Sequence, residues 1–115
     1  MRSSILQKIP LFASLPQNEI KYLASKLIRF DCPQDQFLFH EGAIERGFYI
    51  LLEGEVEIIK SFGTRNERSL GIRKAISLLG EMSLFNRDGH RTATVRSLTP
   101  LKLYKMKRAD FDVLL

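Results

Sequence analysis

The middle of the chain consists of short apolar segments separated by glycine-containing turns, and this pattern restricts the fold more than any other feature. Residues 48–52 are continuously apolar, as expected for a strand that is buried on both faces. Glu53 and Gly54 then form a turn, and residues 55–59 alternate so that valine and isoleucine share one face. Residues 61–67 are polar and contain glycine, which predicts the loop of a hairpin.

Further short apolar segments flank this region, because the helical pattern gives way to strands from about Leu27 onward. The additional strands are predicted within residues 36–40, 70–79 and 101–106 and around Val95. Several short strands at regular spacing with glycine turns are typical of a β-sandwich or jelly roll. We therefore expect a mainly β fold, a double-stranded β-helix or jelly roll, with helices before it and the start of a helix after it.

The first part of the chain has the period of helices. Ser14 and Gln17 have the spacing of a capping box, and Pro16 is tolerated in a first turn, so we predict that a helix begins here. Pro10 separates it from a shorter amphipathic segment that contains residues 5–6. The apolar face of the longer helix, which we expect to pack on the core, is formed by Ile20, Leu23, Ala24 and Leu27.

Length and composition indicate one soluble domain. The chain has 115 residues, of which 44% are apolar and 27% are charged, so we assign residues 1–115 to a single domain with its own core. Cys32 is the one cysteine, which excludes a disulfide framework and favours a reducing, cytoplasmic compartment. Lys8 and Pro10 interrupt the apolar positions near the N-terminus, so we predict neither a signal peptide nor a membrane segment.

The net charge of +5 is moderate, and the basic residues are scattered among acidic ones. We therefore predict no direct nucleic-acid binding within these residues. The densest basic cluster consists of Lys102, Lys105, Lys107 and Arg108. We interpret this cluster as a solvated strand edge followed by a turn.

Residues 80–95 combine a glycine, one carboxylate, a short apolar turn and one arginine within a compact loop. Gly80 lets the backbone approach a ligand, and a helical turn at residues 82–84 would point N–H groups toward an anion. Arg91 offers a planar fork of donors that suits two oxygens of one phosphate. Glu81 accepts hydrogen bonds only, so it suits a sugar hydroxyl and would repel a phosphate beside it. The loop thus suits a ligand with both hydroxyls and a phosphate.

This segment resembles the phosphate-binding cassette of cyclic-nucleotide-binding domains. The positions that carry the resemblance are Gly80, Glu81, Leu84, Phe85, Arg91, Ala93 and Val95. Residues 48–56 are also similar to the strand-turn-strand signature of this family, so the resemblance covers essentially the whole chain. It implies that Glu81 holds the ribose 2′-hydroxyl and that Arg91 holds the exocyclic phosphate oxygens. The other ligand contacts that it implies, mostly through backbone or hydroxyl groups, are Gly80, Met82, Ser83, Thr92 and Ala93.

Two positions in the segment depart from the family pattern. His90 precedes the arginine where many members have proline, which predicts a less rigid loop. Thr92 stands where cAMP-selective members commonly have alanine or serine. A threonine there resembles domains that accept cGMP through its hydroxyl; alternatively, it contacts the phosphate as serine does in bacterial activators. The resemblance therefore implies cAMP or cGMP as the ligand and leaves the choice between them open.

The resemblance also implies a role. Members of the family are regulatory sensors in which cyclic-nucleotide binding shifts the arrangement of helices and so acts on an attached effector. The opening of an amphipathic helix is formed by Asp110, Phe111, Val113, Leu114 and Leu115. In the family, the helix at this place covers the base as a lid, and the given sequence stops at its opening without a C-terminal cap. We therefore expect a truncated lid helix, with the chain being the sensor part of a longer protein. The resemblance implies no cofactor besides the ligand, an effector that the sequence does not identify, and compatibility with a homodimer.

Other interpretations stay open at this point. Glu81 and Arg91 would form a surface ion pair of little energetic consequence. A jelly roll that has lost its ligand would serve as an interaction module. A cupin-like metal site is less favoured, because His40 and His90 are the two histidines of the chain and are far apart in the sequence. No serine has the motif context of a nucleophile, so we do not expect an enzyme.

Overall fold

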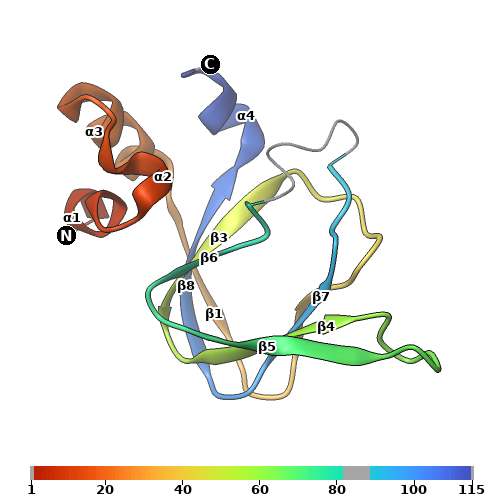
Figure 1. The fold of residues 1–115 in the computed structure, drawn as a ribbon. Coiled ribbons are helices and arrows are strands. Elements are labelled where there is room, and N and C mark those ends of the chain that lie inside the picture. The colour runs from red at the N-terminus through yellow and green to blue at the C-terminus, as the bar shows by residue number, and fades with distance from the viewer. Residues whose placement is uncertain (1, 82–88, 115) are drawn as a thin grey trace.

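The computed structural model describes residues 2–81 and 89–114. It shows a roll of β-strands with the helices gathered at one end (Figure 1). The helices are α1 (Arg2–Gln7), α2 (Pro10–Ala13), α3 (Gln17–Lys26) and α4 (Arg108–Asp112). The strands are β1 (Ile28–Cys32), β2 (Phe37–Phe39), β3 (Gly47–Glu53), β4 (Glu55–Lys60), β5 (Arg68–Lys74), β6 (Ser77–Leu79), β7 (Thr94–Ser97) and β8 (Leu101–Lys107). Within the two described ranges, no helix has the length and apolarity of a membrane span.

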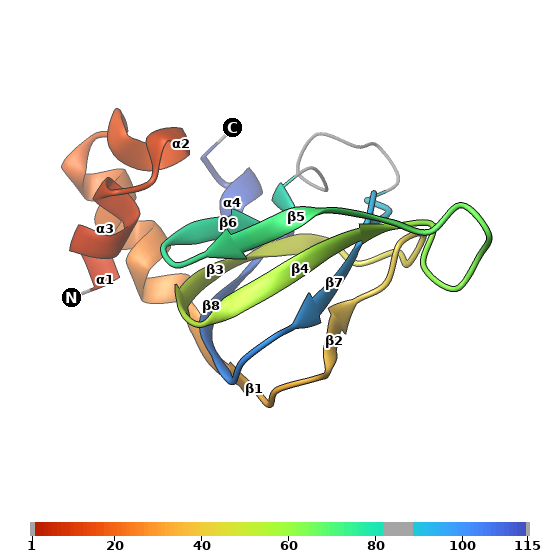
Figure 2. The same ribbon diagram turned by 60° about the horizontal axis from the view of Figure 1, so that its bottom comes forward.

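The strands form two sheets of four, with the order β1-β8-β3-β6 in one and β2-β7-β4-β5 in the other. Neighbouring strands run antiparallel in both sheets. The sheets fold over one another to enclose an apolar interior (Figure 2). This arrangement confirms the predicted jelly roll, and every segment that was predicted as a strand overlaps one. The pairing of β1 with β8, from distant parts of the sequence, adds β1 as an edge strand of the first sheet.

Apolar side chains from both sheets fill the interior of the roll. Val56 is fully buried, as its predicted face requires, but the pairing of β4 with β5 shifts between Ile58 and Ile59. This irregularity ends the alternation, so Ile59 is buried as well. The interior cluster consists of Cys32, Phe39, Tyr49, Leu51, Val56, Leu79, Val95, Leu101 and Leu103. The thiol of Cys32 is therefore enclosed within the roll.

A second apolar cluster joins the helices to the roll. The predicted apolar face of α3 is buried along its length and packs on Phe48 and Ile50 of β3 and on Met106 of β8. Phe12 of α2 stacks on Phe48 with the ring centroids 5.7 Å apart. Phe111 of α4 meets the rings of Phe12 and Phe48 edge-on, each at 6.1 Å. The C-terminal helix predicted from the sequence thus corresponds to α4, which packs in the same apolar cluster as the N-terminal helices.

The start of α3 differs from the predicted capping box. Pro16 is the N-cap residue, without a side-chain cap hydrogen bond, and the helix begins at Gln17. Ser14 is instead the C-cap of α2, and Pro10 is the first residue of that helix. A capping box at Ser14 would require helical dihedrals at Leu15, and these are disfavoured in a residue that precedes proline. The capping-box prediction was wrong for this reason.

The basic cluster near the C-terminus was predicted to lie on a strand edge, but the structure places it elsewhere. It begins in β8, which pairs with β1 on one side and β3 on the other. Lys102 Nζ lies 3.2 Å from Glu53 Oε2, and Lys105 Nζ lies 3.4 Å from Glu45 Oε1. The buried side chains of β8 are Leu101, Leu103 and Met106. The prediction was wrong because a strand that lies between two neighbours can still carry charged side chains when nearby carboxylates balance them.

Candidate functional site

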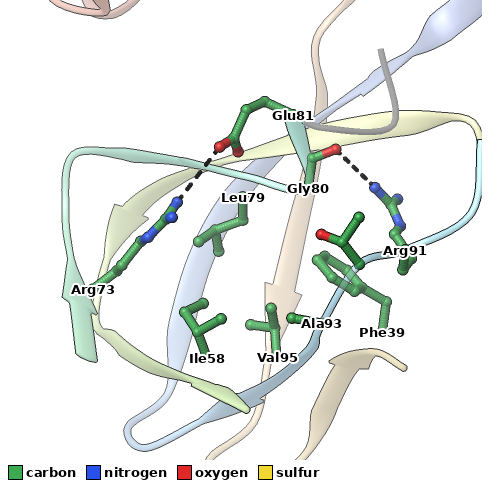
Figure 3. A pocket seen from close by; sticks show the side chains of 10 residues that line it. Phe39, Ile58, Arg73, Leu79, Gly80, Glu81, Arg91, Ala93 and Val95 are labelled. Carbon is green, nitrogen blue, oxygen red and sulfur yellow. Dashed lines mark hydrogen bonds and ion pairs between the residues drawn. The ribbon is translucent and has the colours of Figure 1, made fainter. Parts of the chain in front are cut away.

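A cavity in the roll brings together the residues that the sequence suggested for ligand binding (Figure 3). Of the predicted contacts, the cavity is lined by Gly80, Glu81, Arg91, Thr92 and Ala93. Met82 and Ser83 lie outside the described residues. The other lining residues, which the sequence did not suggest, are Phe39, Ile58, Arg73, Leu79 and Val95. The cavity thus has polar groups at its rim and an apolar floor.

Arg91 is fixed at this cavity through both its backbone and its side chain. Its N–H donates to the Ala43 carbonyl, and its own carbonyl accepts from the Gly42 N–H, each at 2.8 Å. Its Nη1 group donates to the carbonyls of Gly47 at 2.7 Å and Gly80 at 3.1 Å. The residue is only 1% exposed, so the guanidinium group is a buried cation at the cavity wall.

A carboxylate and an aromatic ring accompany this buried cation. Glu45 Oε1 lies 3.3 Å from Arg91 Nη2 and accepts a hydrogen bond from the Tyr49 hydroxyl at 2.8 Å. Burial would raise the pKa of Glu45, but the Tyr49 hydrogen bond and the charges of Arg91 and Lys105 outweigh it and hold the pKa below its ordinary value. Burial and the bond to Glu45 raise the pKa of Tyr49, so its hydroxyl stays a donor. The guanidinium carbon lies 4.3 Å from the centroid of the Phe39 ring.

Glu81 lies in the same cavity but has a different ionic partner. Its Oε1 atom is 3.8 Å from Arg73 Nη1 (Figure 3), and its side chain is 28% exposed. The interpretation of Glu81 and Arg91 as a surface ion pair does not fit a guanidinium group that is almost fully buried. The carboxylate and the buried cation instead take separate positions, with Gly80 between them.

Gly80 is the point of closest approach between the backbone and Arg91. Its φ of +78° lies in the left-handed region that favours glycine. A Cβ atom added at this position would overlap Arg91 Nη1 and lie 3.3 Å from the Phe39 ring. Glycine is therefore required here both for its backbone conformation and for the room that the guanidinium group occupies.

We expect Gly80→Ala to destabilise the protein and to displace Arg91, and Gly63→Ala supplies a matched control. Gly63 has nearly the same φ, +79°, but an added Cβ would have nothing within 4 Å. Both variants therefore carry the strain of a left-handed alanine, and only Gly80→Ala adds the overlap. Urea unfolding should give a free energy of unfolding about 1–3 kcal/mol lower for Gly80→Ala than for Gly63→Ala. Equal values would contradict the close packing of Gly80 against Arg91.

Arg73 is the charged residue at the cavity that sequence reasoning missed. It belongs to β5, where the apolar side chains of Leu70 and Ile72 are 55% and 58% exposed. Arg73 lines the cavity, although the usual pattern places apolar residues inside and charged residues outside. The alternation of residues along β5 shows that Arg73 lies on the opposite face from Leu70 and Ile72. The usual pattern would have placed the two apolar residues, rather than Arg73, on the face toward the cavity.

The surroundings of the two histidines bear on the alternative of a metal site. His40 follows β2 as an exposed residue, and its ring centroid is 4.6 Å from that of Phe37. His90 forms an isolated β-bridge with Ile44. The part of the chain that the structure describes contains no group of three histidine, cysteine, aspartate or glutamate side chains placed to hold a metal ion. The cupin alternative therefore finds no site among these residues.

The fold and this cavity together define a family. The profile described as cyclic nucleotide-binding domain matches residues 29–115. The chain belongs to this family of regulatory sensor domains.

Curated and solved relatives agree with this assignment. The cAMP-dependent protein kinase regulatory subunit of Emericella nidulans is 31% identical over 115 residues, which make up 100% of this chain and 27% of that protein. The cyclic AMP receptor protein of Thermus thermophilus is 28% identical over 106 residues, 92% of this chain and 49% of that protein. The regulatory domain of Toxoplasma gondii PKA, in a co-crystal with cAMP, shares the fold with a TM-score of 0.91 at 24% identity; the match covers 99% of this chain and 43% of that one. The chain spans half or less of the length of these relatives.

Proposed function

We propose that this chain is a regulatory sensor module that binds a cyclic mononucleotide in the cavity and transmits the binding to an attached effector. The observation that carries the proposal is the buried Arg91 guanidinium at one side of Gly80 and the Glu81 carboxylate at the other. A ligand that bridges them needs a negative group and a hydroxyl group a short distance apart. A ribose with a cyclic phosphate meets this requirement.

The phosphate is proposed to bind at Arg91. A buried guanidinium group attracts an anion more strongly than an exposed one, because the surrounding dielectric constant is lower. Glu45 already serves as a counter-anion there, and it is also held by Tyr49 and Lys105. A phosphate can therefore approach Arg91 without leaving the Glu45 carboxylate alone. The backbone at residues 92–93, together with Met82 and Ser83, is proposed to complete the phosphate contacts.

The sugar and base are proposed to lie on the other side of Gly80. Glu81 accepts a hydrogen bond from the ribose 2′-hydroxyl, and its separation from Arg91 keeps the carboxylate away from the phosphate. The apolar floor of Ile58, Leu79 and Val95 suits the nonpolar faces of the sugar and base.

A short connection links the cavity to the helices. The Gly47 carbonyl, which accepts from Arg91, directly precedes Phe48, and Phe48 packs against α2 and α4. We propose that nucleotide binding at Arg91 acts on the arrangement of these helices, as expected of a sensor without catalytic activity. The effector, a possible homodimer and a cytoplasmic location belong to this proposal and rest on the family relationship.

Calorimetric titration of the full chain with cAMP, cGMP and adenosine tests the proposal. Binding of at least one cyclic nucleotide is expected, whereas adenosine, which lacks the phosphate, should release no measurable heat. The names of the relatives favour cAMP, and Thr92 at the rim favours cGMP as well. We therefore expect Thr92→Ala to lower the affinity for cGMP by about fivefold, the value of one hydrogen bond, and to leave that for cAMP unchanged. No heat with either nucleotide would contradict the sensor function.

A further inference from the structure

Arg73 is placed where it can control the Glu81 carboxylate. It lies near the C-terminal end of β5, the last strand of its sheet, and faces across the cavity toward Glu81 (Figure 3). Its Nη1 atom lies 3.8 Å from Glu81 Oε1 and donates a hydrogen bond to the Leu78 carbonyl at 3.0 Å. The same guanidinium nitrogen thus contacts the strand that leads into Glu81 and the carboxylate itself.

The position of Arg73 is set by the pairing of its strand. Its register partner on β4 is Val56, which is fully buried in the roll. The bond from Arg73 to Leu78 then ties β5 to β6, two residues before Gly80. Arg73 is therefore anchored on the framework, whereas Glu81 follows directly after a glycine with a left-handed conformation.

The Arg73–Glu81 ion pair contributes little to folding stability, so we consider its effect on the orientation of the Glu81 carboxylate. The two side chains are 47% and 28% exposed, and ion pairs in such positions contribute little to folding. A cation beside Glu81 nevertheless reduces the number of directions in which the carboxylate points. This lowers the cost of binding a 2′-hydroxyl, because the acceptor is already oriented before the ligand arrives.

We propose that Arg73 is a positioning residue that holds Glu81 ready for the ribose 2′-hydroxyl of the nucleotide. This inference rests on the proposed function of the cavity, and it assigns to β5 a role in selecting ribonucleotides over their 2′-deoxy analogues. Arg73 itself acts through Glu81 rather than through the phosphate.

The test compares the affinities for cAMP and cGMP with those for their 2′-deoxy analogues, measured on the full chain by calorimetry. The wild-type protein should prefer the ribonucleotide by about tenfold or more, as for a hydrogen bond to a charged acceptor. Arg73→Gln should reduce this preference to within about threefold of that of Glu81→Gln, while the affinity for the 2′-deoxy analogue stays nearly unchanged. Adding Arg73→Gln to Glu81→Gln should change the preference no further.

Lys74→Gln is the matched control, because it removes one positive charge from the next residue of the same exposed strand. It should keep the wild-type preference, and circular dichroism should give all variants the same thermal midpoint within a few degrees. A wild-type preference that persists in Arg73→Gln overturns the inference but leaves the sensor function intact. An equal loss of affinity for both sugars also overturns it, because Arg73 would then act on the phosphate. Failure of the wild-type protein to bind any of these nucleotides overturns the sensor function and this inference with it.

Discussion

Replacing Arg91 by alanine is expected to weaken cyclic-nucleotide binding by about 2–5 kcal/mol, the usual penalty for truncating one partner of a buried charge pair. The guanidinium group is 1% exposed and is held by the Gly47 and Gly80 carbonyls, so it is oriented before a phosphate arrives. Removing it takes away the cation that is proposed to hold the phosphate, and it also removes an ionic partner of the Glu45 carboxylate. Calorimetric titration of the variant with cAMP and cGMP measures the loss directly.

Two control variants separate ligand binding from folding. Arg91→Lys keeps the charge but lacks the planar fork, so it should recover only part of the affinity. Arg96→Ala removes an arginine on β7 that pairs with Glu57 at 2.7 Å and does not line the cavity, so nucleotide affinity should stay unchanged. Unfolding in urea must also show that Arg91→Ala is folded at the temperature of the titration. Wild-type affinity in a folded Arg91→Ala protein would remove Arg91 from the binding site.

Replacing Phe48 by alanine is expected to have the largest effect on stability, a loss of about 3–5 kcal/mol in the free energy of unfolding. Phe48 is fully buried, and its ring contacts Phe12 of α2 and Phe111 of α4. The alanine variant would therefore leave a cavity at the junction of the helices with the roll. Urea unfolding followed by circular dichroism measures the change.

Phe62→Ala is the matched control for this prediction. Phe62 also contacts another phenylalanine, with its ring centroid 5.0 Å from that of Phe37, but it is 37% exposed in the hairpin loop. Its removal should lower the free energy of unfolding by about 1 kcal/mol or less, because little buried surface is lost. Similar losses in the two variants would show that the helices are not packed on the roll through Phe48.

Sequence patterns with a local cause were sufficient for much of this fold. The apolar face of α3 follows from helical periodicity alone, and the β3–β4 turn follows from Gly54 between two apolar segments. The position of a strand within a sheet has no such local cause. The lysines of β8 were interpreted as an edge, because the strands that flank β8, β1 and β3, come from distant parts of the chain and cannot be identified locally. Ser14 and Gln17 have the spacing of a capping box, but Pro16 disfavours a helical Leu15, so α3 begins at Gln17 instead.

The candidate site was also predicted only in part, because some of its features are local in the sequence and others depend on tertiary pairing. The spacing of Glu81 and Arg91 is local, and the structure places both at one cavity. The burial of Arg91 depends on Glu45 and Gly47, which meet it only after the strands have paired. Arg73 was missed because its strand turns apolar side chains outward, which reverses the usual pattern. Tertiary pairing, rather than composition, determines these features.

The enclosure of Cys32 makes the chain suitable for distance measurements by electron paramagnetic resonance. It is the one cysteine of the sequence and is 6% exposed, so thiol reagents reach introduced cysteines first. The Tyr22 hydroxyl of α3 donates to the Asp110 carbonyl of α4 at 2.9 Å, which places these two helices in contact. Nitroxide labels on Lys26→Cys, at the end of α3, and on Val113→Cys, at the C-cap of α4, would therefore report the separation of these helices. Any separation of the two helices on addition of nucleotide would then appear as a longer interspin distance, without removal of the native thiol.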